Sequence, residues 1–74
     1  MKKETVEITT EYIKLDSFLK LCGAAQSGGS AKEMVAAGNI LVNGEPCTQR
    51  GRKLRDGFIV TVENREFEVK GIEA

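Results

Sequence analysis

The sequence predicts an α+β domain in which two packed helices lie against a small antiparallel sheet of about four to five short strands. Apolar residues recur at helical spacing in two segments of the first half, whereas after residue 39 they alternate with polar residues. Neither helix can bury its apolar stripe alone, so both are expected to pack on one face of the sheet. With 74 residues, the chain is expected to form a single domain, residues 1–74.

The N-terminal part of the chain predicts a short strand and a first helix. In residues 5–9, Val6 and Ile8 fall on one side, which indicates an edge strand leading into a turn. Residues 14–25 carry an apolar stripe at i, i+3, i+4 and i+7, which predicts a helix of about two to three turns ended by Gly23. The stripe consists of Leu15, Phe18, Leu19 and Cys22.

Residues 26–39 predict the second helix. Its N-cap is either Ser27 or Ser30, the second of which would form a capping box with Glu33. Gly38 is expected to end the helix, because glycine enters the left-handed conformation without steric cost. The apolar face consists of Ala31, Met34 and Val35.

After the second helix, the chain predicts four short strands in two hairpins separated by a basic segment. Asn-Gly is typical of tight hairpin turns, and a proline in a strand is expected at a sheet edge, here Pro46. The hairpins span residues 40–47 and 58–69, with turns at Asn43-Gly44 and near Asn64.

The formal net charge is zero, but the charges are separated along the chain. From Lys14 to Arg55 there are seven basic and three acidic residues, a net charge of +4, whereas the flanks hold four basic and eight acidic residues, a net charge of −4. A local basic region can attract a polyanion although the total charge is zero. The pI of about 6.2 therefore does not exclude a nucleic acid as partner.

The residue types present argue against catalysis and metal binding. The chain has no histidine, so Ser-His and Cys-His arrangements are excluded. The acidic residues lie singly and mostly alternate with apolar ones on the C-terminal strands, as on a solvated face. Cys22 and Cys47 fit no metal-ligand spacing and are interpreted as small core residues. We expect neither an enzyme nor a bound metal or cofactor.

Residues 47–57, CTQRGRKLRDG, give the strongest indication of a site. Such a run could simply be a soluble surface, but here no acidic residue stands among the basic ones, between Glu45 and Asp56. In an extended segment, Arg50 and Arg52 would point to the same side, and arginine forks match phosphate oxygens. With Lys53 and Arg55, they predict a phosphate-binding surface whose affinity falls with salt.

The starts of the two predicted helices add further candidates. Lys14 precedes the first helix, and Lys32 lies in the first turn of the second, where the dipole disfavours a cation unless an anion is bound. The stretch SGGSAK allows three interpretations: a flexible start of the helix, a contact with a nucleic-acid backbone, or a nucleotide site lacking the usual GxxxxGK[ST] spacing. Few aromatic residues are free to stack on bases, which favours structured RNA recognised through its shape and backbone.

These motifs together resemble a known family. The order LDxxLK, SGGxAK, VNGE and RGRKL, over about residues 8–69, is similar to the small RNA-binding domain named after ribosomal protein four of the small subunit, also called the alpha-L motif. The similarity is greater to its free-standing bacterial YaaA or YbcJ type. It implies a pair of helices on a small sheet, with RNA across the second helix and the basic loop. The implied RNA-binding residues are Lys14, Ser27, Gly28, Gly29, Lys32, Arg50, Arg52, Lys53 and Arg55.

The sequence departs from the family pattern in three places. Lys14 stands where the family usually has arginine, and Gly28 replaces an arginine common in the wider family. The order Arg-Asp-Gly-Phe at residues 55–58 replaces the usual Gly-Asp before the next strand, so we expect a rearranged turn there.

We therefore expect a non-enzymatic, monomeric RNA-binding protein that contacts ribosomal RNA, transfer RNA or the ribosome. It is expected in the cytoplasm, because no apolar run follows the N-terminal lysines, and without a membrane partner or a small-molecule substrate. Two alternatives remain open. The basic patch and the exposed strand edges could dock an acidic protein. The VNGE hairpin also occurs in sulfur carriers, although these end in Gly-Gly and this sequence ends in Gly-Ile-Glu-Ala.

Overall fold

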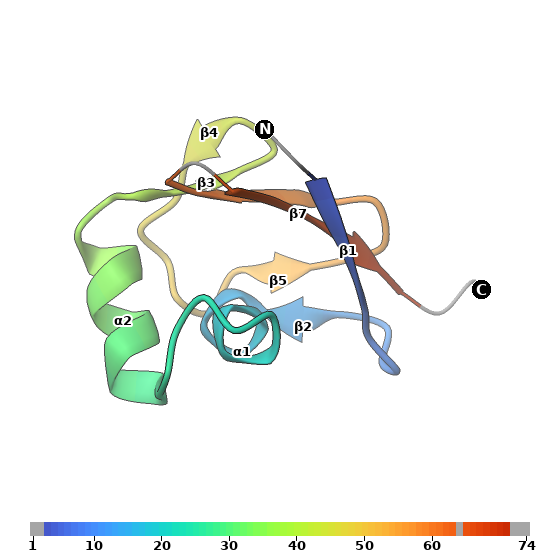
Figure 1. Ribbon diagram of the computed structural model, residues 1–74, viewed down its shortest axis with the longest axis horizontal. Coiled ribbons are helices and arrows are strands. Elements are labelled where there is room, and N and C mark those ends of the chain that lie inside the picture. Colours follow the sequence, from blue (N-terminus) through green and yellow to red (C-terminus); the bar gives the residue numbers. More distant parts are fainter. Residues whose placement is uncertain (1–2, 64, 72–74) are drawn as a thin grey trace.

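The computed structural model describes residues 3–63 and 65–71 and confirms the α+β fold class. Both helices lie on one side of a five-stranded sheet (Figure 1). In chain order, the elements are β1 (Lys3–Glu7), β2 (Ile13–Lys14), α1 (Leu15–Leu21), α2 (Gly28–Ala36), β3 (Ile40–Val42), β4 (Glu45–Pro46), β5 (Lys53–Leu54), β6 (Ile59–Val62) and β7 (Arg65–Lys70).

The main sheet is mixed, with the strand order β1-β7-β6-β3-β4. The hairpins β3–β4 and β6–β7 and the β3–β6 pair are antiparallel, whereas β1 runs parallel to β7. The expectation of a wholly antiparallel sheet was therefore wrong at this edge. Parallel neighbours need a long connection, and almost the whole chain separates β1 from β7. The pairing continues past the strand, where the Ile8 N–H donates to the Lys70 carbonyl (2.8 Å).

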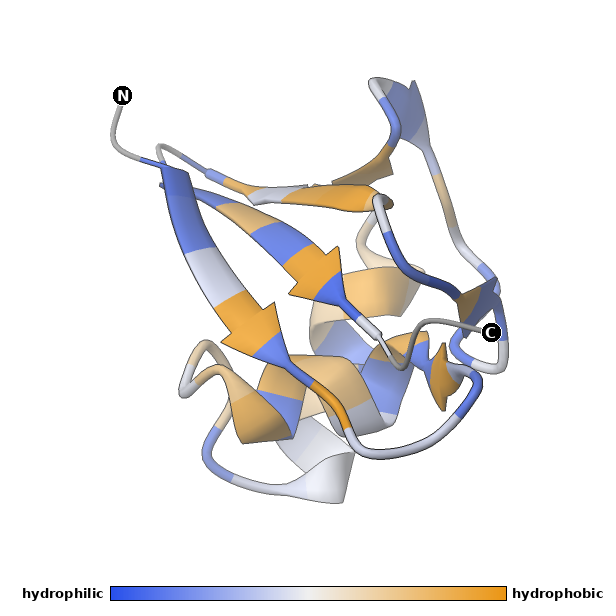
Figure 2. Ribbon diagram, turned by 90° about the vertical axis from the view of Figure 1, so that its right-hand side faces the viewer, coloured by the Kyte–Doolittle hydropathy of each residue, from blue (hydrophilic) through white to orange (hydrophobic). Residues whose placement is uncertain are grey.

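The core forms between the inner face of the sheet and the two helices. Figure 2 shows apolar and polar residues alternating along the strands. Phe67 from β7 contacts Phe18 from α1 edge to face, with ring centroids 6.3 Å apart. The predicted stripe of α1 is confirmed, since Leu15, Phe18 and Leu19 are fully buried and Cys22 is half-buried. Cys47 is buried, and both cysteines are free thiols.

Local signals in the sequence set the helix and hairpin ends as predicted. Ser27, rather than Ser30, is the N-cap of α2. Gly38 follows this helix with φ +77°, and Asn43 and Gly44 both have positive φ, as a tight hairpin turn requires. Pro46 lies on β4, at the edge of the sheet. The predicted turn residue Asn64 lies outside the described residues. Within the described ranges, no helix is long and apolar enough to cross a membrane.

Candidate nucleic-acid interface

A small antiparallel ribbon, formed by β2 and β5, places Lys14 directly opposite Lys53. Their neighbours Ile13 and Leu54 form the second pair of the register. Because side chains alternate along a strand, the two pairs face opposite sides. Leu54 is fully buried and Ile13 half-buried, whereas both lysines are exposed. The outer side of the ribbon thus presents two adjacent ammonium groups to solvent.

Tyr12 and Arg55 extend this outer side by one residue on each strand. The Lys53 Nζ lies 4.9 Å from the centre of the Tyr12 ring, and the Arg55 Cζ lies 5.7 Å from it. We call Tyr12, Lys14, Lys53 and Arg55 the basic ribbon. Sequence reasoning missed Tyr12, because it considered aromatic residues only for stacking on bases. The available signal was its position two residues before Lys14, which puts both side chains on one side of an extended segment.

The loop before β5 is tied to the start of α1 through its backbone. The Leu15 N–H donates to the Arg52 carbonyl (2.9 Å), and the Asp16 N–H donates to the Arg50 carbonyl (3.0 Å). These bonds satisfy amide groups that a helix start leaves without partners. The Arg52 N–H donates to the Gln49 carbonyl (3.1 Å), which makes this part of the loop a turn.

That turn corrects one step of the sequence reasoning. The alternation that would point Arg50 and Arg52 to the same side holds only in an extended segment, and this segment is not extended. The two arginines are instead held near each other because their carbonyls bind successive amides of α1. Both residues are exposed.

The Asp56-Gly57 turn orients the other end of the basic segment. Gly57 has φ +89°, a conformation that side chains disfavour, and its N–H donates to the Val69 carbonyl (2.8 Å). The Asp56 carboxylate accepts from the Gly71 N–H (2.9 Å). Asp56 therefore anchors the turn to the end of β7, and the departure from the family pattern leaves Arg55 beside Tyr12.

The start of α2 is a second group of predicted site residues. The Ser27 hydroxyl accepts from the Ser30 N–H (3.1 Å). Gly28 and Gly29 are exposed and have no positive φ, and a Cβ on Gly28 would meet no atom within 4 Å outside its chain neighbours and the backbone of its own helix. The fold therefore does not require glycine here, and the glycines leave the backbone open. Lys32 is exposed, and the first turn has no acidic residue.

The structure thus divides the nine predicted residues into two groups on either side of α1. In Figure 1, the β2–β5 ribbon lies on one side of α1 and α2 lies on the other. No hydrogen bond or ion pair between described residues joins the groups. The first group contains Lys14, Arg50, Arg52, Lys53 and Arg55, and the second contains Ser27, Gly28, Gly29 and Lys32.

The positive charges of the site have no carboxylate partner among the described residues. The ion pairs found there join Lys3 to Glu68 (3.3 Å) and Arg65 to Glu4 (3.0 Å), all on β1 and β7. These ion pairs lie on β1 and β7, at one edge of the main sheet, and involve none of the predicted site residues. The exposed cations of the ribbon and the helix starts remain available to an external anion.

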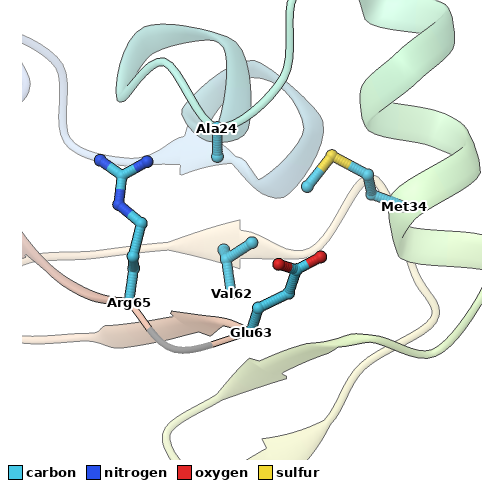
Figure 3. Close-up of a pocket in the computed structure, with 5 residues that line it drawn as sticks. All are labelled: Ala24, Met34, Val62, Glu63 and Arg65. Carbon is cyan, nitrogen blue, oxygen red and sulfur yellow. The ribbon is translucent and has the colours of Figure 1, made fainter. Parts of the chain in front are cut away.

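A groove of about 250 Å³ lies elsewhere, between the α1–α2 connection, α2 and the ends of β6 and β7 (Figure 3). The basic residue in its lining, Arg65, is already paired with Glu4. Across the described residues, no three cysteine or acidic side chains gather as metal ligands would. Neither feature competes with the basic surface as the candidate site. The lining residues are Ala24, Met34, Val62, Glu63 and Arg65.

Comparison with known proteins gives a consistent result. A family model described as S4 domain matches residues 6–70. The chain is also similar to the "Probable ribosome maturation protein RlbA" of Bacillus subtilis (strain 168), with 48% identity over 58 residues that cover 78% of this chain and 82% of the relative. The resemblance drawn from the sequence motifs is thereby confirmed: the chain belongs to the S4 domain family.

Proposed function

We propose that this protein binds structured ribosomal RNA, in the ribosome or in a particle being assembled, through the basic ribbon, the loop at Arg50 and Arg52, and the start of α2. It does so without catalysis. The observation that carries the proposal is the position of Lys14, because three separate physical effects disfavour a lysine there.

Lys14 is the N-cap of α1, where serine, threonine, aspartate or asparagine is preferred, and its side chain makes no capping hydrogen bond. A cation at this end also opposes the helix dipole. In addition, Lys14 lies opposite Lys53, and like charges directly opposite each other destabilise a strand pair. A bound phosphate would relieve the second and third effects, because it supplies negative charge at the helix start and between the two lysines.

The chemistry of the surface favours an RNA backbone over bases as the main contact. Exposed lysines and arginines neutralise phosphates, and the open amides at Gly28 and Gly29 add backbone donors at a helix N-terminus. Tyr12 is the aromatic residue of the ribbon, and two cations already lie against its ring. Recognition through shape and phosphates is typical of double-stranded RNA.

The relative supports the ribosome as the location of the target. Its printed name describes a ribosome maturation protein, which favours ribosomal RNA over transfer RNA and an assembly particle over the mature ribosome. The proposal places the protein in the cytoplasm, as a monomer, and requires no cofactor, membrane or small-molecule substrate.

The test compares three proteins in sedimentation with ribosomal particles from Bacillus subtilis lysate. The first is the parent, and the second carries Arg50→Ala, Arg52→Ala and Lys53→Ala. The control removes the same charge from β1 and β7 through Lys3→Ala, Arg65→Ala and Lys70→Ala. At about 1 kcal/mol or less for each phosphate contact, we expect the site variant to lose roughly 1 to 3 kcal/mol of binding and the control to cosediment as the parent does. A folded site variant that cosediments like the parent would contradict the proposal.

Competition separates RNA binding from the alternative of an adaptor that docks an acidic protein. Excess ribosomal RNA should strip the parent from the particles, since both would compete for the same cations. Retention on the particles in excess RNA, combined with loss after mild protease treatment of the particles, would favour the adaptor.

A further inference from the structure

Tyr12 lies next to β2 in the basic ribbon and contacts two of its cations, although it is neither a cation nor a phosphate ligand. We propose that Tyr12 is a positioning residue of the RNA interface, whose ring holds Lys53 and Arg55 in place without neutralising their charge. The inference rests on the proposed function for its partner and on the contacts of the ribbon for its geometry.

The contacts show one ring shared by two cations. The Lys53 Nζ lies 4.9 Å and the Arg55 Cζ 5.7 Å from the ring centre, both inside the distance of about 6 Å at which a cation is attracted to an aromatic face. Lys53 and Arg55 lie on one side of the same strand segment, separated by the buried Leu54. The ring therefore counteracts a repulsion that neither cation can avoid by pointing inward.

A comparison within the chain shows what an aromatic partner offers. Arg65 also lies over a ring, with its Cζ 4.8 Å from the centre of Phe67, but it is paired in addition with the Glu4 carboxylate at 3.0 Å. That carboxylate cancels the charge of Arg65. On the ribbon, no carboxylate of the described residues pairs with Lys53 or Arg55. A ring orders these two side chains and leaves their full charge for phosphate.

Ordering matters because long basic side chains lose conformational freedom when they bind. Fixing a free lysine or arginine costs conformational entropy, and a side chain already held against a ring has lost part of that freedom. The two cations contact the face of the aromatic ring and not the phenol hydroxyl. The Thr10 hydroxyl donates to the backbone carbonyl of Tyr12 (2.6 Å), a bond that phenylalanine would keep. Tyr12→Phe should therefore still position Lys53 and Arg55, whereas Tyr12→Leu should no longer position them.

The test measures the affinity of the full chain for ribosomal RNA extracted from Bacillus subtilis ribosomes, over a series of salt concentrations. We expect Tyr12→Leu to bind about three- to tenfold more weakly than the parent, with an unchanged salt dependence because no charge is lost. Tyr12→Phe should bind within about twofold of the parent. In a chain that carries Lys53→Ala and Arg55→Ala, Tyr12→Leu should have no further effect, since no cation remains to be positioned.

Three results would overturn the inference: parent-like binding by Tyr12→Leu, equal losses with leucine and phenylalanine, or a loss that persists without Lys53 and Arg55. A second measurement needs no RNA. Proton resonances of the Lys53 and Arg55 side chains should be shifted upfield by the ring in the parent and in Tyr12→Phe, and not in Tyr12→Leu. Absence of these shifts in the parent would overturn the inference while leaving RNA binding intact. Failure of the parent to bind the RNA, with the shifts present, would instead overturn the proposed function.

Discussion

Replacing Lys14 with glutamate should make the protein more stable and a weaker RNA binder. The introduced carboxylate would lie opposite Lys53, so that a repulsive cross-strand pair becomes an attractive one, worth roughly 0.2 to 1 kcal/mol. It would also put negative charge at the N-cap of α1, worth roughly 0.3 to 1 kcal/mol. No capping bond is lost, because the lysine side chain makes none.

Because Lys14 is exposed, we take about 1 kcal/mol as the expected total gain in the free energy of unfolding. In a domain of this size, 1 kcal/mol raises Tm by about 4 to 8 °C. Thermal unfolding followed by circular dichroism at low salt measures this shift, which should shrink in high salt. The same variant should bind ribosomal RNA about tenfold or more weakly, with a salt slope lower by about 0.7 to 0.9.

The matched control is Lys20→Glu, which makes the same change of charge at the other end of α1. Lys20 is exposed in the last turn, where a cation stabilises the helix, so this variant should lower Tm and leave RNA binding unchanged. A lower Tm for Lys14→Glu would contradict the claim that Lys14 is retained at a cost in stability. Equal losses of RNA affinity in both variants would show that overall charge, rather than the ribbon, controls binding.

Three further predictions test the helix start, the core and a thiol. Ser27→Asp should keep the cap of α2 and the thermal stability of the protein but weaken RNA binding. Ser27→Ala should lower the free energy of unfolding by about 1 kcal/mol. A loss of stability with aspartate and none with alanine would contradict the capping role. Phe67→Ala should lower the free energy of unfolding in urea by about 3 to 5 kcal/mol, because the buried ring fills the core against Phe18, and a loss below about 1 kcal/mol would refute that packing. Burial raises the pKa of the Cys22 thiol above its ordinary value of 9.0, so the folded state holds this proton more tightly than the unfolded state. The contribution of this thiol to folding stability is therefore fully present below pH 9 and is lost as the pH rises through its pKa in the folded state. Cys22→Ala should reduce this loss of stability, measured by urea unfolding at a series of pH values. An unchanged loss would show that other groups cause it.

Much of the fold was predictable because its signals are local. The stripe of α1 follows from the spacing of Leu15, Phe18 and Leu19, and the start of α2 follows from a serine placed before a helical segment. The Asn43-Gly44 turn depends on two positive φ angles that these residue types adopt readily. Each of these features is decided by residues within a few positions of one another.

The β2–β5 ribbon was not predicted, because its strands have two residues each and are far apart in the sequence. Such short strands leave no periodicity to detect. The parallel pairing of β1 with β7 was missed for a related reason, since nothing local distinguishes it from an antiparallel edge. The individual basic residues could be chosen from charge and from the family resemblance. Their grouping could not, because it depends on the ribbon register and on the hydrogen bonds between α1 and the loop.

The most direct test of the RNA interface is ultraviolet crosslinking of the protein to ribosomal particles, followed by mass spectrometry of the peptides that carry a crosslinked nucleotide. The account predicts crosslinks within residues 12–14, 27–32 and 50–55, which belong to the ribbon, the start of α2 and the basic loop. Salt should reduce these crosslinks together, because all of them depend on phosphate contacts. Crosslinks confined to residues 3–7 and 65–70, on β1 and β7, would contradict the account, because they would place the RNA on strands that carry none of the proposed site residues.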